Sequence, residues 1–167
     1  MKGPKAAAPV FLLLLAISVC LACGNNANHA PKVAAEESAA INLSAITGSN
    51  QTQTFSEVKR VSSLPKAVLD QLGRIADRGQ PFNTTDVVDP KLPMRQLTVA
   101  AVSKQYCIVG YWHGGIVLAF TTAIFELSDG NAKLIWLSYS QGGFNFRDLK
   151  AMVESGRMHN DLDKNGL

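Results

Sequence analysis

The apolar residues in the second half of the chain fall into runs that indicate β-strands. Branched and aromatic residues dominate four stretches: 96–102, 105–112, 116–127 and 132–139. The links between them are two to four residues long, and the last contains Asp129-Gly130, a strong hairpin signal. Four strands with such short links predict an antiparallel meander. The third run, which begins at Ile116, is apolar on both faces and predicts a covering layer on each side of the sheet.

Helical periodicity appears on both sides of these strands. Before them, four apolar residues recur every three or four positions: Leu64, Val68, Leu72 and Ile75. This stripe predicts a helix that begins near Ser63 and ends at Gly79. After the strands, a second helix is predicted to begin behind Asn145, whose side chain can cap it, and to end at Gly156. Its buried stripe has four members: Phe146, Leu149, Met152 and Val153.

These elements predict the domain organisation. The order helix, four-stranded antiparallel meander, helix gives a single α+β domain over residues 58–158. Residues 23–57 contain few large apolar side chains and many Ala, Ser, Asn, Thr and Gln, so we predict a flexible tether. A short docked helix over residues 39–46 is the alternative. Residues 159–167 are predicted to form a polar tail.

The first 22 residues have the architecture of an export signal. Lys2 and Lys5 precede an apolar core from Val10 to Val19, which is too short for the usual membrane-spanning helix. The end of this segment, Leu21-Ala22-Cys23, resembles a bacterial lipoprotein signal, and the resemblance covers about residues 1–24. It implies cleavage before Cys23, a lipid on Cys23, and a membrane anchor that holds the protein at the bacterial cell envelope.

One residue departs from the lipoprotein pattern. Cys20 occupies the place, three residues before the lipidated cysteine, where the family usually has leucine. The alternatives are ordinary cleavage after Ala22, which gives a secreted or periplasmic protein, and an uncleaved N-terminal anchor. If Cys23 is acylated, Cys107 is the single free thiol of the mature chain. If Cys23 is free, a Cys23–Cys107 disulfide is conceivable.

Most of the positive net charge is lost when the predicted signal is removed. The whole chain has 16 Lys and Arg against 13 Asp and Glu. Without Lys2 and Lys5 the balance is 14 against 13, a formal charge of +1. A basic footprint for nucleic acid is therefore not indicated, and we expect no nucleic-acid partner.

The closing residues resemble part of a calcium-binding loop. Asp161-Leu162-Asp163-Lys164-Asn165-Gly166 matches the first half of such a loop, D-x-D-x-N-G. The sequence stops before the twelfth position, where a glutamate completes the coordination. No two histidines have a metal-ligand spacing either. We therefore expect a solvated polar end and no metal or other cofactor.

Two local patterns suggest catalysis without completing a site. His113-Gly114-Gly115 is similar to the oxyanion loop of some esterases, but the chain has no G-x-S-x-G nucleophile motif. Cys107 and His113 offer a thiol and a base, but six residues along one strand separate them by roughly 20 Å. A glycine turn and a buried cysteine explain both patterns, so we expect no catalytic residue.

A membrane span competes with the second and third strands. Residues 106–125 contain no formal charge and have the length of a transmembrane helix. Gly114-Gly115 at the middle of this stretch, together with many β-branched residues, favours a hairpin instead.

An aromatic surface remains as the candidate for function. The second and fourth strands of the meander run parallel, so the ends of both fall at the same end of the sheet. There the sequence predicts a recognition surface of five residues: Tyr111, Trp112, His113, Tyr139 and Phe144. The alternative is that these side chains only cap the core.

These observations favour a non-enzymatic module that binds or assembles with an unknown protein or envelope component. Its second expected partner is the membrane, through a lipid anchor on Cys23. The alternatives are a secreted enzyme whose site has no local motif, and a small secreted inhibitor-like protein. A deep pocket with convergent polar residues would favour the enzyme, and a flat aromatic patch would favour the inhibitor.

Overall fold

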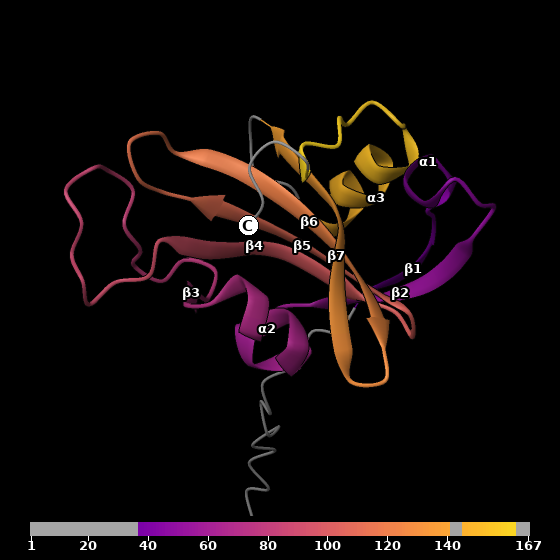
Figure 1. Ribbon diagram of the computed structural model, residues 1–167, viewed down its shortest axis with the longest axis horizontal. Helices are drawn as coiled ribbons and strands as arrows, with labels where there is room; N and C mark the ends of the chain where they lie inside the picture. The colour runs from indigo at the N-terminus through magenta and orange to yellow at the C-terminus, as the bar shows by residue number, and fades with distance from the viewer. Residues whose placement is uncertain (1–36, 141–144, 163–167) are drawn as a thin grey trace, which may run out of the picture. The chain divides into compact units, whose positions relative to one another are not determined.

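A mostly antiparallel sheet organises the part of the chain that the computed structural model describes, residues 37–140 and 145–162. Within these ranges the sheet has seven strands: β1 Ser38–Asn42, β2 Thr52–Val58, β3 Ile75–Ala76, β4 Arg95–Val102, β5 Tyr106–His113, β6 Ala119–Ser128 and β7 Asn131–Ser140. Their order across the sheet is β1-β2-β4-β5-β6-β7, and the short β3 pairs with β4 in parallel (Figure 1). The α+β class and the β4–β7 meander are as predicted, but the sheet is larger than four strands.

The prediction of a flexible tether is wrong for the residues that form strands β1 and β2. Residues 23–57 were expected to lack structure, whereas residues 38–58 form two strands joined by the short helix α1, Ser44–Thr47. The alternative prediction, a short helix over residues 39–46, is also wrong, because residues 38–42 form a strand. Three of the few large apolar residues of this segment are fully buried: Ile41, Leu43 and Phe55. Burial and long-range pairing therefore order a segment whose composition is polar.

The helix before the meander is shorter than predicted. A 3-10 turn, Val61–Ser63, precedes α2, Lys66–Leu72, and Gly73 ends that helix with a positive φ of 68°. Leu64, Val68 and Leu72 are buried as expected, but Ile75 belongs to β3. The final helix, α3, spans Phe146–Glu154, and Asn145 caps it by accepting the Asp148 N–H at 2.9 Å.

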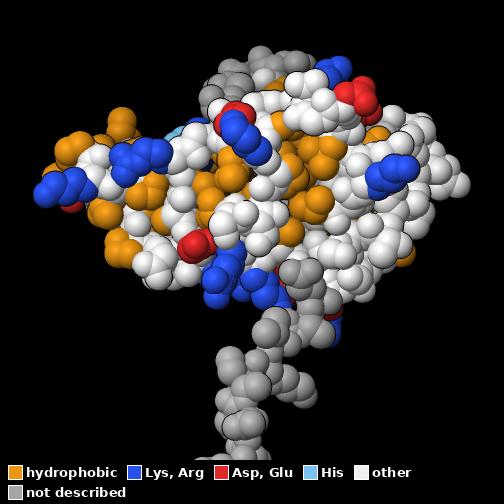
Figure 2. All heavy atoms as spheres, turned by 90° about the horizontal axis from the view of Figure 1, so that it is seen from below, with side chains coloured by type: hydrophobic (Ala, Val, Ile, Leu, Met, Phe, Trp, Pro, Cys, Tyr) orange, Lys and Arg blue, Asp and Glu red, His pale blue; other side chains and the backbone are white. Residues whose placement is uncertain are grey.

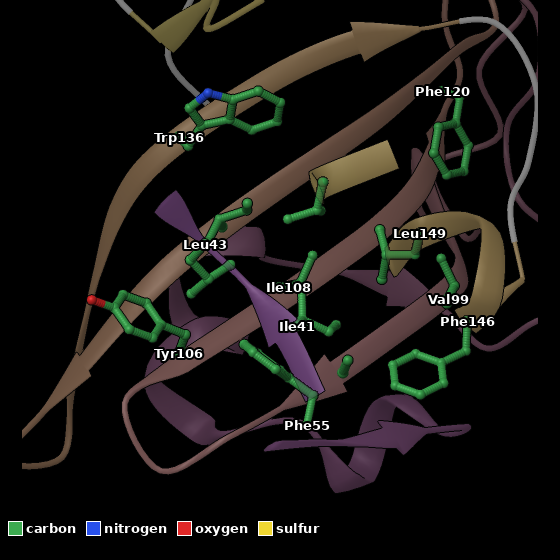
Figure 3. Close-up of a cluster of buried hydrophobic side chains, with 13 residues drawn as sticks. Ile41, Leu43, Phe55, Val99, Tyr106, Ile108, Phe120, Trp136, Phe146 and Leu149 are labelled. Carbon is green, nitrogen blue, oxygen red and sulfur yellow. The ribbon is translucent and has the colours of Figure 1, made fainter. Parts of the chain in front are cut away.

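A hydrophobic core lies on each face of the sheet. Helices α3 and α1 cover one face, and α2 covers the other (Figure 1). Figure 3 shows the α3-side core, where side chains of β1, β2 and β4 to β7 meet those of Phe146 and Leu149. The alternate side chains of β5 divide between the cores, with Ile108 on the α3 side and Val109 on the α2 side. This confirms the expectation of a covering layer on each side.

The third strand of the meander begins later than its apolar run. Strand β6 starts at Ala119, which pairs with His113, and residues 114–118 form a loop. Ile116, Val117 and Leu118 were expected to point into the sheet faces, and they are exposed instead. The competing membrane span is replaced by β5 and β6. Among the described residues, no helix combines the length and the apolar character needed to cross a bilayer.

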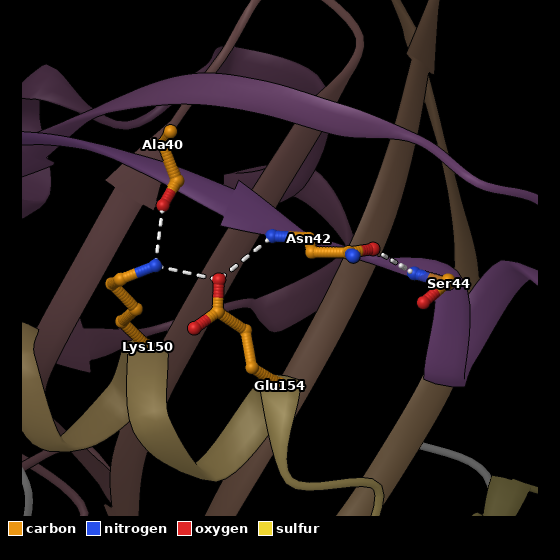
Figure 4. A network of polar contacts seen from close by, with 5 residues as sticks. All are labelled: Ala40, Asn42, Ser44, Lys150 and Glu154. Carbon is orange, nitrogen blue, oxygen red and sulfur yellow. Dashed lines mark hydrogen bonds and ion pairs between the residues drawn. The ribbon is translucent and has the colours of Figure 1, made fainter.

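At both edges of the sheet, some of the outward backbone groups have side-chain or backbone partners. At β1, Lys150 Nζ donates to the Ala40 carbonyl (2.6 Å), and the Asn42 N–H donates to Glu154 Oε1 (3.0 Å; Figure 4). The Lys150–Glu154 pair itself is 2.5 Å apart. At β7, the Asp161 N–H donates to the Leu137 carbonyl (2.7 Å), so part of the predicted polar tail lies along this edge.

Candidate functional site

Two loops meet at one end of the sheet, and we call residues 80–94 and 114–118 together the loop end. The Gly114 N–H donates to the Met94 carbonyl at 2.8 Å, and the Asn83 N–H donates to the Pro93 carbonyl at 2.9 Å. A Cβ on residue 114 would lie 1.7 Å from the Asn83 carbonyl oxygen. Glycine is therefore required at position 114 because the two loops are in backbone contact there.

The side chain of Asn83 organises the longer loop from inside. It is 4% exposed, its Nδ2 donates to the carbonyls of Asp89 and Leu92 (both 3.0 Å), and its Oδ1 accepts the Asp89 N–H (2.8 Å). From outside, the Arg74 guanidinium donates to the carbonyls of Pro90 (3.0 Å) and Lys91 (2.5 Å). The loop is held by side-chain bonds to its own backbone, so its conformation does not depend on an apolar core.

The loop end exposes aliphatic side chains. Five of them project into solvent, with exposed fractions of 82% for Val87, 52% for Val88, 93% for Ile116, 72% for Val117 and 45% for Leu118. Figure 2 shows apolar side chains beside Lys and Arg side chains at this end of the domain. Grouped exposure of large apolar residues on ordered loops is typical of an interaction site.

The predicted aromatic surface is divided between the two faces of the sheet. Tyr111 is 2% exposed in the α2-side core, whereas Trp112 packs on the α3 side with its ring edge-to-face on Phe120, centroids 5.4 Å apart. Tyr139 is 38% exposed and pairs with Thr121, as Tyr111 does, so these two tyrosines lie at the same end of the sheet as expected. Phe144 lies outside the described residues.

The fourth described member, His113, belongs to a cluster around Arg95. The two residues are paired across β4 and β5, and the Arg95 guanidinium lies 5.9 Å from the Tyr111 ring centroid. Arg95 also donates to the Leu72 carbonyl at the end of α2. Burial, and then the Arg95 charge, lower the pKa of His113, while burial raises the pKa of Tyr111 to about 12. The cluster joins α2 to β4 and favours neutral forms of both side chains.

The candidate nucleophile is part of the core. Cys107 is fully buried, and burial raises the pKa of its thiol to about 12, so the thiolate that attacks substrates is disfavoured. His113 lies six residues further along the same strand, too far for proton transfer. This arrangement supports a packing role for Cys107.

The described residues hold no group of three or more His, Cys, Asp or Glu side chains arranged to bind a metal ion. Asp161, the first residue of the calcium-like motif, places its Oδ2 at 3.4 Å from the Tyr139 N–H on the β7 edge. Residues 163–167 lie outside the described ranges, as does the predicted lipidation site Cys23.

A different surface lies at the opposite end of the sheet. There, a hollow of about 370 Å³ is bordered by the β6–β7 turn, the start of α2 and Lys104. We call the connections at this end, residues 103–105 and 128–131, the turn end. Its exposed side chains include Lys104, Asp129 and Asn131, which are polar or charged.

Sequence reasoning missed the loop end for an identifiable reason. Val87 and Val88 stand in a proline-containing segment that reads as a plain loop, and Ile116–Leu118 continue the apolar run of β6. The available signal was the length of that run, because twelve residues from 116 to 127 exceed the usual strand. Gly114-Gly115 marks the turn but not how far the following loop extends.

Comparison of the chain with protein-family models, with curated proteins and with solved structures finds no match in any of the three. The functional argument therefore rests on the residues of the chain itself.

Proposed function

We propose that this protein is an exported, envelope-tethered binding module without enzymatic activity. In this proposal a lipid on Cys23 anchors the chain, and the folded domain binds an envelope component through the loop end. The lipoprotein-like residues Leu21-Ala22-Cys23 support the anchor. The loop end supports the binding role.

The single observation that carries the binding role is the exposure of five aliphatic side chains on loops that hydrogen bonds hold in place. Burial of one such side chain stabilises a contact by about 1.5–3 kcal/mol. Because Asn83 and Arg74 already hold the longer loop through backbone hydrogen bonds, binding would order little additional chain. A site that is both apolar and pre-organised fits recognition better than catalysis.

The two alternative functions lack a comparable observation. An enzyme would need an activated group, and both the buried Cys107 thiol and the tyrosine Tyr111 have pKa values of about 12, raised by burial. An inhibitor-like protein would use the aromatic surface, but Tyr111 and Trp112 point to opposite faces of the sheet. We therefore favour the binding module.

The anchor is tested by the intact mass of the mature protein and its distribution between membrane and soluble fractions. We expect a chain that starts at Cys23, carries acyl chains and sediments with membranes, while Cys23→Ser appears in the soluble fraction or remains unprocessed. An unmodified mature chain in the soluble fraction would contradict the tether.

The binding surface is tested by photocrosslinking in intact cells. A photoreactive residue is placed at Val88 or Val117 in the loop end, and at Lys104 or Asn131 in the turn end as the matched control. We expect adducts at the loop end that are absent from the turn end. Equal labelling at all four positions would reject the loop end as the binding surface.

A further inference from the structure

We infer that the envelope component bound by the loop end is the lipid bilayer surface itself, into whose interface the aliphatic side chains insert. This inference rests on the proposed function and names the partner of the same site. Three properties of the chain carry it: the reach of the anchor, the type of apolar side chain, and the charge around those side chains.

The first property is reach. Fourteen residues separate Cys23 from Ser38, and they can span at most about 50 Å when extended. The pairing of Ser38 with Ser56 and of Ser56 with Val102 places the start of β1 level with the end of β4. From Val102 back to Arg95, beside the loop end, is about 23 Å along the strand. A lipid on Cys23 can therefore keep the loop end in contact with the same membrane leaflet.

The second property is the chemistry of the exposed side chains. All five are Val, Ile or Leu, and they stand on loops that project from the end of the sheet. Contacts that dominate protein–protein interfaces are enriched in Trp, Tyr and Arg, whereas Val and Leu are under-represented among them. Insertion into a bilayer interface scales with the buried apolar area, to which attraction to anionic lipids can add, and it needs no complementary pocket. The side-chain types therefore favour lipid over a protein partner.

The third property is the charge beside the apolar group. Arg74 and Lys91 are both exposed, and the Arg74 guanidinium donates to the Lys91 carbonyl, so two cations stand at the longer loop, residues 80–94. Asp86 and Asp89 in the same loop balance these two cations. Attraction to anionic lipid is consequently small, so binding should depend on apolar insertion and change little with salt.

The test uses the mature full-length chain with Cys23→Ser, which removes the anchor, and vesicles of phosphatidylethanolamine and phosphatidylglycerol. We expect the chain to sediment with vesicles, with less than about a twofold change in affinity between 50 and 300 mM salt. Val117→Asp should weaken this binding at least about tenfold, because a carboxylate must lose its hydration to enter the interface. Asn131→Asp at the turn end is the matched control and should bind like the parent.

Insertion is measured separately with a polarity-sensitive fluorophore on Val117→Cys in the same background. The buried Cys107 thiol should not compete for the label. We expect a blue shift on addition of vesicles, and no shift for the label on Lys104→Cys. Absence of vesicle binding, or binding that Val117→Asp leaves unchanged, would overturn the inference.

The two proposals fail in different ways. A discrete protein adduct at Val117 in cells, without vesicle binding, overturns the bilayer inference and leaves the binding module intact. Vesicle binding together with lipid adducts at Val117 supports both. Absence of vesicle binding and of any loop-end adduct overturns both.

Discussion

The loop end and the turn end close the same meander with different chemistry. At the turn end, Ser103 accepts the Tyr106 N–H through its Oγ at 3.0 Å, and Asp129 and Gly130 turn the chain with φ values of 51° and 78°. Both of the side chains in these turns, Ser103 and Asp129, are polar; Ser103 is half-buried and Asp129 is exposed. At the loop end, the buried Asn83 bonds the backbone from inside, and the exposed positions carry Val, Ile and Leu.

The two ends differ in whether the same residues both shape the backbone and face the solvent. At the turn end the exposed polar residues both shape the turn and cover it. At the loop end a concealed polar side chain shapes the loop, so the exposed residues are not needed for folding. The proposed binding role gives a reason for aliphatic side chains at those positions.

The largest difference in stability between variants of the two ends should come from replacing a glycine at each end with alanine. Gly114→Ala forces a Cβ against the Asn83 backbone, and we expect it to lower the free energy of unfolding by about 3 kcal/mol. Gly130→Ala meets no atom within 4 Å and should cost about 1 kcal/mol, from its positive φ. Urea unfolding of both variants measures the difference. Equal losses would show that the loops are not in firm contact.

Asparagine replacements should give the next largest contrast. Asn83→Ala leaves the backbone groups of Asp89 and Leu92 without their partner, and we expect a loss of about 2 kcal/mol. Asn131→Ala removes an exposed contact of 3.5 Å and should stay within about 0.5 kcal/mol of the parent. Hydrogen exchange at the Asp89 amide should accelerate only in the first variant. An unchanged exchange rate at this amide would contradict the role of Asn83 in holding the loop.

A smaller, pH-dependent effect on stability is expected from His113, the last residue of β5, next to the loop end. Burial and the Arg95 charge lower its pKa in the folded state. The unfolded chain therefore binds a proton before the folded one does, and stability is full above pH about 6.5 and declines as pH falls below it. Unfolding midpoints measured from pH 7.5 to 5 should show this decline, and His113→Gln should flatten it. A decline that survives the substitution would assign it to other groups.

The smallest effect should follow from the exposed aliphatic residues themselves. Val88→Ser and Val117→Ser should each change the free energy of unfolding by less than about 0.5 kcal/mol, because neither side chain packs in a core. Val109→Ser, in the α2-side core, is the control and should cost about 3 kcal/mol. A large loss in either exposed variant would mean that the loop end serves stability, and not binding.

The meander and α3 could be predicted because their signals are local. Asp129-Gly130 marks a hairpin, and Asn145 stands before a four-residue apolar stripe. Strands β1 and β2 could not be predicted in this way. They are ordered by pairing with each other, by pairing of β2 with β4, and by burial of Ile41 and Phe55. Composition reports how much apolar surface a segment has, and not whether the fold places a partner beside it.

The candidate site was hidden for a related reason. Ile116–Leu118 and the start of β6 form one apolar run, and only the pairing of His113 with Ala119 shows where the sheet ends. The helix α2 was predicted too long because Ile75 continues its spacing, although Gly73 already stops the helix. In both cases periodicity continued past a boundary that backbone geometry imposes.

The partly covered edges of the sheet bear on how copies of this chain behave when they are crowded together. If the proposed lipid on Cys23 anchors the chain, copies in one membrane are confined to two dimensions and collide more often than free copies do. An open strand edge would turn such collisions into sheet-to-sheet growth. Lys150 and Glu154 occupy the β1 edge, and segment 160–162 runs along β7. Burial raises the pKa of Glu154, but the hydrogen bonds from Lys150 and the Asn42 N–H and the Lys150 charge together lower it, so this closure persists in mildly acidic surroundings.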